Sequence, residues 1–337
     1  MPVDRAEAAC CDRCAGAATA VRIARRRLLK AALLRPAEPG AAGFATSGEL
    51  PRAVTGTVTD VSPHFLVVGH GAHEERLALT PDAVAWRGGP VEPAVLRPGD
   101  QVVVRLHRTA RDVADRIWAN IGRVAGTIVE RTEQGLLVDE GSTRKRQFVI
   151  IPARAAGRIQ VRFPTLAPGY LIDVIGLRRG GVLEALIPAT YQPAYRAGQM
   201  PRATLAGGHV PGAISGSATW HEPADEPPGV LGVAYPALDP EAGCGEGPGP
   251  GPGGPGPARL PYLSVGSILQ VRNDCTGSSC LLPVTSCAPV ARLFSDRCTT
   301  CGTSPRSRVA DLSQASFIAL GGELEQGCFN ATIAIGG

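Results

Sequence analysis

The chain has 337 residues, of which 44% are hydrophobic and 19% are charged. This balance allows a buried core and excludes a wholly disordered chain, and the length fits about two domains. The net charge of +4 is too small to indicate nucleic-acid binding by itself. With 42 glycines, 30 prolines and few long helical patterns, the chain is predicted to be mainly β.

Residues 1–52 form a basic N-terminal segment, which contains the run ARRRLLK followed by AALL. This run resembles a twin-arginine export signal, with Arg25 and Arg26 as the arginine pair. Arg35 and Pro36 interrupt the apolar stretch almost at once, so a basic amphipathic helix or a basic arm is the alternative. No stretch reaches the roughly 18 apolar residues of a membrane-spanning helix, so we expect no membrane span.

Two segments in the middle of the chain repeat each other. GTVTDVSPHFLVV at 56–68 matches GTIVERTEQGLLV at 126–138, and LRPGD at 96–100 matches LAPGY at 166–170. The sequence offset is the same for both pairs, which indicates an internal duplication. Apolar and polar residues alternate in each copy, and each Pro-Gly turn leads into an apolar strand, with Gly in a positive-φ conformation.

We therefore predict two tandem small β-barrels, OB-like or SH3-like, at 53–109 and 121–190, joined by a short helix or connection at 110–120. OB-like barrels often bind oligonucleotides or oligosaccharides. Aromatic residues make up only 4% of the chain, too few for base-stacking platforms, so we expect no nucleic-acid partner. The barrels are expected to act as a scaffold or to contact a protein partner. Residues 191–213, rich in Pro, Gly and Ala, are predicted to be a linker.

The ten cysteines cluster at the two ends of the chain, and none lies between 15 and 243. Clustering in the C-terminal part predicts a disulfide-stapled domain in an oxidising compartment. The two CxxC pairs could form a four-thiolate zinc site instead, but they are far apart in sequence, so we favour disulfides and expect no metal site and no cofactor. The disulfide candidates are Cys244, Cys275, Cys280, Cys287, Cys298, Cys301 and Cys328.

Residues 214–337 carry several motifs, interrupted by a Gly/Pro-rich loop at 245–258. In chain order they are ATW, LPYLSVGSILQVRN, CAP and VADLSQASFIALGG, followed by a closing apolar strand. In this order they resemble the double-psi β-barrel family of rare lipoprotein A, barwin and expansin domains. The resemblance implies a disulfide-stapled double-psi β-barrel that binds cell-wall polysaccharide.

Asp311, within the last of these motifs, has two expected roles. By its position it ends a strand and can cap the helix that begins with Leu312 and Ser313. The resemblance implies a second role, because in wall-cleaving members of the family this Asp faces the polysaccharide cleft as general acid or base. Ser286 stands where the family has its second acid, and the His that usually precedes the LP strand is absent. Glycosidic cleavage normally needs two carboxyl groups.

Three functions fit these residues. The favoured one is an exported protein, secreted or associated with the cell wall, that binds peptidoglycan or a related polysaccharide without cleaving it. Trp220 and Tyr235 would stack on sugar rings, with core packing as their alternative role. The second function is a lytic transglycosylase-like enzyme that uses Asp311. The third is a cytoplasmic protein that binds zinc or nucleic acid. The missing acid and His favour the first function over the second.

Overall fold

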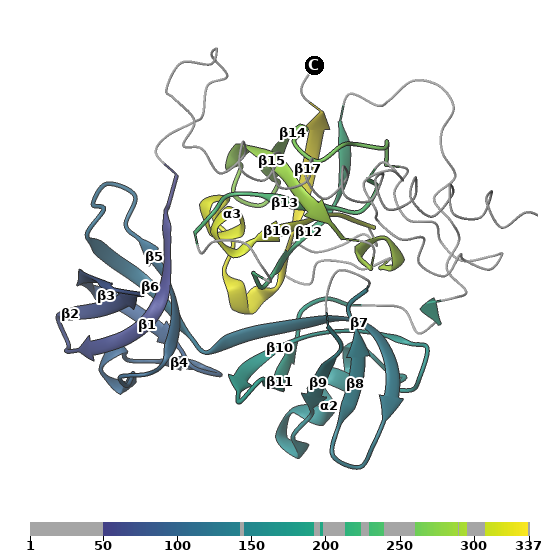
Figure 1. The fold of residues 1–337 in the computed structure, drawn as a ribbon, viewed down its shortest axis with the longest axis horizontal. Helices are drawn as coiled ribbons and strands as arrows, with labels where there is room; N and C mark the ends of the chain where they lie inside the picture. Colours follow the sequence, from purple (N-terminus) through teal and green to yellow (C-terminus); the bar gives the residue numbers. More distant parts are fainter. Residues whose placement is uncertain are drawn as a thin grey trace, which may run out of the picture. The chain divides into compact units, whose positions relative to one another are not determined.

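The strands of this chain form three small closed barrels in sequence order, so the predicted mainly β, tandem-barrel fold is confirmed. Figure 1 shows the three groups of strands, coloured purple to blue, teal, and green to yellow. Ala45–Gly337 is one compact unit. The computed structural model describes residues 50–141, 145–191, 196–197, 213–223, 229–238, 260–288, 290–294 and 307–335.

Several predictions fall on residues outside the described ranges. They include the proposed export signal with Arg25 and Arg26, the Gly/Pro-rich loop at 245–258, and nearly all of the predicted linker at 191–213. Within the described residues, no helix is long and apolar enough to cross a membrane.

The first barrel has the strand order β2-β1-β5-β6-β3 and is closed by pairing of β2 with β3. Its last strand, β6, occupies most of the segment at 110–120, so the expected helix or connection there is wrong. Ala114 and Ile117 of this strand lie in the barrel core. The two charged residues that separate them, Asp115 and Arg116, interrupt the alternation of apolar and polar residues by which a strand is recognised in the sequence. The elements are β1 (Ala53–Val61), β2 (Phe65–His70), β3 (His73–Trp86), β4 (Pro90–Val91), η1 (Pro93–Val95), β5 (Gln101–Leu106) and β6 (Val113–Ala119).

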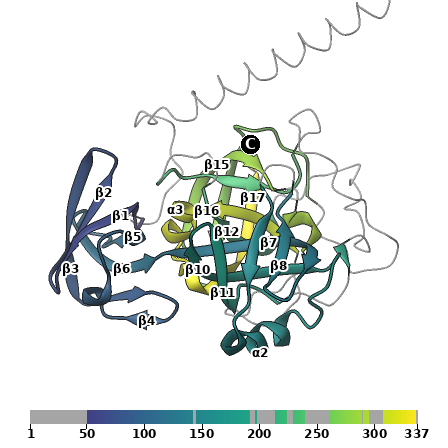
Figure 2. The same ribbon diagram turned by 60° about the horizontal axis from the view of Figure 1, so that its bottom comes forward.

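The second barrel has the strand order β10-β11-β9-β8-β7, and β9 and β11 run parallel where it closes. The first barrel contains an equivalent parallel pair, β3 and β6. This five-stranded arrangement, with a helix before the fourth strand, fits the OB-like alternative. Figure 2 shows that helix, α2, at the lower edge of the barrel. The elements are β7 (Ile121–Arg131), β8 (Leu136–Asp139), β9 (Gln147–Ile150), α2 (Ala153–Arg162), β10 (Leu171–Arg179) and β11 (Val182–Pro188).

The duplication is visible in matching hydrogen bonds at the two Pro-Gly turns. The amide of Gly99 donates to the carbonyl of Val58 at 2.9 Å, and the amide of Gly169 donates to the carbonyl of Ile128 at 2.8 Å. The two glycines have φ angles of 95° and 87°, which side-chain-bearing residues adopt only with strain. The turns therefore have the geometry expected from the sequence.

The third barrel has six strands in the order β12-β16-β13-β15-β14-β17. Two pairs are parallel, β12 with β16 and β13 with β15, and the other pairs are antiparallel. Buried and exposed residues alternate strictly along β14, as expected for a strand with one face in the core. The elements are β12 (Ile214–His221), β13 (Val233–Tyr235), β14 (Ile268–Asn273), β15 (Ser279–Cys287), η4 (Ala291–Leu293), β16 (Arg308–Ser313), α3 (Gln314–Ala319), η5 (Leu324–Gln326) and β17 (Cys328–Ile335).

The cap of α3 differs from the expectation. Ser313 is the N-cap residue, and its hydroxyl oxygen accepts a hydrogen bond from the amide of Ser316. Asp311 lies two residues earlier, inside β16, where it pairs with Thr219 on β12 and Ala234 on β13. The predicted helix-cap role of Asp311 is therefore wrong, because β16 continues to Ser313 before the helix begins.

The described cysteines of the third barrel fall into two groups. Cys275 and Cys287 are disulfide-bonded, but no disulfide joins two cysteines of the described residues, so the predicted staple stays a prediction. Cys280 and Cys328, also disulfide candidates, are instead buried thiols. Strand alternation turns the Cys280 side chain toward the apolar core, on the same face of β15 as Leu282 and Val284. Cys244, Cys298 and Cys301 lie outside the described residues.

Burial raises the pKa of the Cys280 thiol, so little reactive thiolate forms. We expect iodoacetamide at pH 8 to leave Cys280 unmodified in the folded protein and to modify it fully once the protein is unfolded without reductant. Cys275 and Cys287 should react only after unfolding and reduction. Mass spectrometry of the digested protein measures each site, and rapid alkylation of Cys280 in the folded protein would contradict its burial.

Candidate functional site

The candidate site is a polar cluster around Asp311, at the contact between the second and third barrels. The Thr219 hydroxyl donates to Asp311 Oδ1 at 2.8 Å, and Arg123 Nη1 donates to the same oxygen at 3.4 Å. His221 Nδ1 lies 3.7 Å from Asp311 Oδ2. The Asp311 side chain is 17% exposed. These contacts hold a partly exposed carboxylate in one orientation.

Arg123 comes from β7 of the second barrel and links the two barrels. Its guanidinium forms a fork with Asp173, with Nε 2.8 Å from Oδ1 and Nη2 2.6 Å from Oδ2. It also donates to the backbone carbonyl of Trp220, next to the strand position of Thr219. The Arg123 side chain is only 2% exposed. A buried arginine is thus shared between a structural carboxylate and the candidate functional one.

Asp173 on β10 is the centre of the buried charges behind the site. Its Oδ2 accepts hydrogen bonds from Arg308 Nη2 at 2.6 Å and from the Thr190 hydroxyl at 3.3 Å, in addition to the Arg123 fork. Burial alone would raise the pKa of Asp173, but the positive charges of Arg123 and Arg308 outweigh it and hold the pKa below its usual value. Asp173 is therefore a charged anchor.

A second ion pair lies at the same contact. Arg178 of β10 donates to Glu222, with Nη2 2.9 Å from Oε1, and both side chains are 23% exposed. Glu222 also accepts from the backbone amide of Arg123 at 2.6 Å. A further set of contacts joins the first barrel to η5 of the third, where Glu325 accepts hydrogen bonds from Arg116 and Trp118. Charged contacts therefore attach the third barrel to both OB-like barrels.

His221 is a site residue that the sequence analysis did not identify. It is 6% exposed and lies beside Asp311. Thr219 and His221 are two positions apart on β12, so they share a strand face, and both contact Asp311. Strand alternation from Thr219 was the signal that could have identified it.

The strand register relates Asp311 to the position of the missing second acid. Asp311 pairs with Ala234 on β13, and Ala234 pairs with Ser286 on β15. Two strand spacings of about 4.8 Å separate the backbones of Asp311 and Ser286 by roughly 10 Å. The serine predicted to replace an acid therefore lies in the same row of residues as Asp311.

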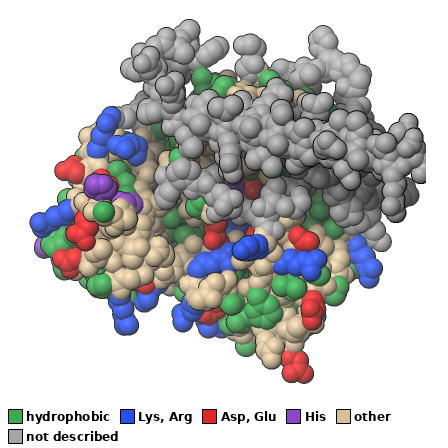
Figure 3. All heavy atoms as spheres, in the orientation of Figure 1, with side chains coloured by type: hydrophobic (Ala, Val, Ile, Leu, Met, Phe, Trp, Pro, Cys, Tyr) green, Lys and Arg blue, Asp and Glu red, His purple; other side chains and the backbone are tan. Residues whose placement is uncertain are grey.

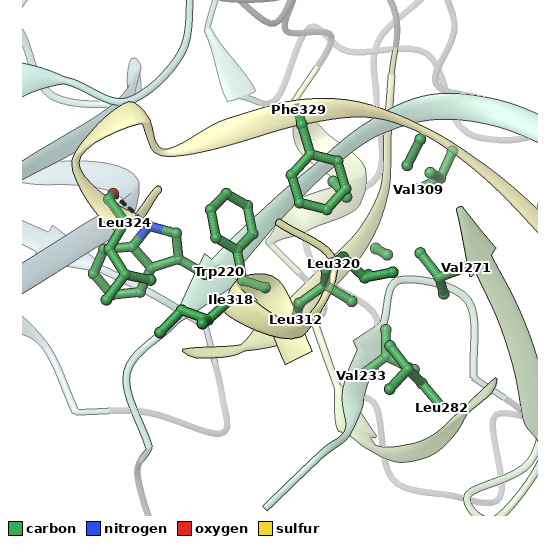
Figure 4. Close-up of a cluster of buried hydrophobic side chains, with 14 of the residues drawn as sticks. Trp220, Val233, Val271, Leu282, Val309, Leu312, Ile318, Leu320, Leu324 and Phe329 are labelled. Atoms are coloured by element: carbon green, nitrogen blue, oxygen red, sulfur yellow. Dashed lines mark hydrogen bonds between the residues drawn. The ribbon is translucent and has the colours of Figure 1, made fainter. Parts of the chain in front are cut away.

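The two aromatic residues predicted to stack on sugar belong to the core. Trp220 and Tyr235 are both 0% exposed. Figure 4 shows Trp220 among the apolar side chains of the third barrel, with its indole nitrogen donating to the carbonyl of Leu324. The Tyr235 hydroxyl donates to the carbonyl of Pro261, and burial raises the pKa of its phenol. The stacking role is wrong for both, because each side chain is buried in the hydrophobic core, where no sugar can reach it.

An exposed aromatic residue lies elsewhere in the third barrel. It is Tyr262, whose side chain is 48% exposed. It follows Pro261, whose carbonyl is held by Tyr235. In the described part of the chain, no group of three or more His, Cys, Asp or Glu side chains could hold a metal ion.

Comparison with solved structures gives a weak likeness. No protein-family model and no curated protein matches the chain. One similar solved structure is a multidomain protein with nucleic-acid-binding domains from Streptococcus pneumoniae. The sequences are 14% identical, the match covers 45% of this chain and 58% of that chain, and the TM-score is 0.16. A likeness at this score carries no argument about the function of this chain.

The expectation that nucleic acid is not a partner is wrong as an exclusion, because the reasoning behind it does not cover phosphate contacts. The expectation was based on the low aromatic content of the whole chain. That fraction cannot exclude phosphate contacts, which Lys and Arg side chains make without any aromatic residue. Figure 3 shows Lys and Arg side chains on the described surface, interspersed with Asp and Glu.

Proposed function

We propose that this protein is exported, associates with the cell wall, and uses its third barrel to bind peptidoglycan or a related polysaccharide without cleaving it. The observation that carries the proposal is the geometry of Asp311. Its carboxylate is partly exposed and is oriented by Thr219 and Arg123. A carboxylate fixed in this way can accept charge-assisted hydrogen bonds from sugar hydroxyls, which are stronger than bonds between neutral groups.

The strand arrangement of the third barrel also supports the proposal. Six strands that close with two parallel pairs suit a double-psi β-barrel, the fold implied by the order of the sequence motifs. Tyr262 offers an exposed aromatic face in the same barrel, and such a face can stack on a sugar ring. It takes the place of Trp220 and Tyr235 as the candidate stacking residue.

Binding without cleavage is favoured by the groups around Asp311. Its described partners are a hydroxyl, a guanidinium and an imidazole, and Ser286 occupies the row position of the second acid. A guanidinium next to a carboxylate favours the charged form, which suits an acceptor more than a proton donor. Hydrolysis of a glycosidic bond normally uses two carboxyl groups, one of them protonated.

One observation favours the alternative, a lytic transglycosylase-like enzyme. His221 Nδ1 lies 3.7 Å from Asp311 Oδ2, and an imidazole placed beside a carboxylate is a common arrangement in general acid–base catalysis. The two functions differ in whether soluble fragments appear when the protein meets its polysaccharide.

We expect the full chain to sediment with insoluble peptidoglycan and Asp311→Asn to bind about tenfold more weakly, because it loses a charge-assisted acceptor. Asp274→Asn is the matched control, since Asp274 belongs to the same barrel but contacts Arg272 and Thr332 instead. Binding is measured by co-sedimentation, and the supernatant is analysed by mass spectrometry.

A wild-type protein that stays in the supernatant would overturn the binding proposal. An equal loss in the two Asn variants would show that Asp311 is not the site. Muropeptides released by the wild type and absent with Asp311→Asn would establish the enzyme instead.

A further inference from the structure

The third barrel does not build the Asp311 site alone. Of the described groups that contact the carboxylate, Thr219 and His221 come from β12 of the same barrel, and Arg123 comes from β7 of the second. Ala234, its strand partner on β13, carries no charge. Arg123 is thus the one fully charged group contributed to the described site by another barrel.

The position of Arg123 is determined by the second barrel. Its fork to Asp173 uses Nε and Nη2, which leaves Nη1 directed to Asp311 and to the carbonyl of Trp220. Asp173 is held in turn by Arg308 and Thr190. A planar guanidinium can make this fork and still donate on its third side, which a lysine cannot do.

We infer that Arg123 is a positioning residue for Asp311, so that the polysaccharide site is complete only when the second barrel is docked on the third. This inference rests on the proposed polysaccharide binding and assigns the OB-like barrels a part in it. Arg123 itself need not touch the ligand, because its side chain is 2% exposed. It acts by orienting the Asp311 carboxylate and by favouring its charged form.

The test is a double-mutant cycle in the full chain, with binding to insoluble peptidoglycan as the readout. Arg123→Gln should weaken binding about tenfold, as Asp311→Asn does, because either change removes the oriented, charged acceptor. In the Asp311→Asn background, Arg123→Gln should have less than about a twofold further effect, since its target is gone. A purely structural arginine would weaken binding by the same factor in both backgrounds.

Arg178→Gln is the matched control. Arg178 also joins the second barrel to the third, through Glu222, but no described contact joins it to Asp311. Its effect on binding should be the same with Asp or Asn at position 311. Arg123→Lys is a second variant that keeps the charge without the fork, and we expect its loss of binding to lie between those of the wild type and Arg123→Gln.

The pH dependence of binding gives a second readout that a structural role would not change. Binding that needs a charged Asp311 falls as the pH is lowered, and without Arg123 the charge is less stable, so half of the binding should be lost at a higher pH. His221 also faces the site, and the Asp311→Asn variant isolates its contribution to binding. Arg178→Gln should leave the midpoint unchanged.

The outcomes separate the two proposals. A wild type that binds no polysaccharide overturns the proposed function and this inference with it. A wild type that binds, with equal effects of Arg123→Gln in both backgrounds or an unchanged pH midpoint, overturns the positioning role alone. If Arg123→Gln weakens binding only when Asp is present at position 311, and also raises the pH midpoint of binding, the result supports both proposals.

Discussion

Replacing Asp173 with Asn is expected to lower the free energy of unfolding by about 3–5 kcal/mol, the cost of removing one partner from a buried ion pair. Asp173 is 0% exposed and accepts hydrogen bonds from Arg123 and Arg308, whose side chains are 2% and 1% exposed. An amide cannot balance these two positive charges, and neither arginine can reach water without opening the contact between the barrels. Urea unfolding followed by circular dichroism measures the change.

Asp115→Asn is the control, because Asp115 pairs with Arg105 at a site where the side chains are 29% and 20% exposed. Both side chains are partly exposed and Glu323 still balances the charge of Arg105, so the change should cost no more than about 1 kcal/mol. If Asp173→Asn costs as little as Asp115→Asn, the buried charges do not hold the barrels together.

The effect of Asp173→Asn should also depend on pH. The arginines hold the pKa of Asp173 in the folded protein below the unfolded value of about 3.9. The stabilisation is therefore fully present above the unfolded pKa and is lost as the pH falls through the folded pKa. The wild type and the variant should differ by a constant amount above about pH 5 and converge on further acidification. A difference that grows below pH 4 would contradict this sign.

Replacing Trp220 with Ala is expected to destabilise the protein by about 3–5 kcal/mol, the usual cost of truncating a large buried aromatic side chain. Trp220 is 0% exposed, and its indole nitrogen donates to the carbonyl of Leu324 at 2.8 Å. The alanine variant would leave a cavity and an unpaired carbonyl in the core. Thermal unfolding measures the loss, and polysaccharide binding should fall only in proportion to the unfolded fraction.

Tyr262→Ala is expected to have the opposite effects, with little loss of stability but weaker binding. Its side chain is 48% exposed, so truncation should cost less than about 1 kcal/mol of stability. Binding should weaken severalfold if the ring stacks on sugar. A stable Trp220→Ala protein with impaired binding would restore the original interpretation of Trp220 as a ligand contact.

Several features of this protein could be predicted from local sequence alone. The alternation of apolar residues and the repeated Pro-Gly turns predicted two small barrels, and Gly99 and Gly169 have the required positive φ. Turn chemistry and the two-residue strand period act within a few residues, so sequence carries them directly. The same pattern failed at 110–120, where Asp115 and Arg116 inside β6 interrupted the apolar alternation.

The site depended on information that sequence patterns do not contain. Asp311 was identified from its motif, but its partner Arg123 lies 188 positions away and resembles any charged strand residue. For Trp220 and Tyr235 the sequence left both sugar stacking and core packing open, because strand alternation reveals two faces without saying which one is inside. Closure of the barrel decides that question.

The sequence by itself thus determined the class of fold, the duplication and the residue at the centre of the candidate site. Only the tertiary structure decided which charges are buried together, because a buried ion pair forms only where packing removes water from residues of separate strands. Arg123 and Asp173 meet Asp311 and Arg308 through the docking of one barrel on another. No local pattern predicts that contact, because each of the four residues lies in a strand whose own sequence pattern does not depend on the other barrel.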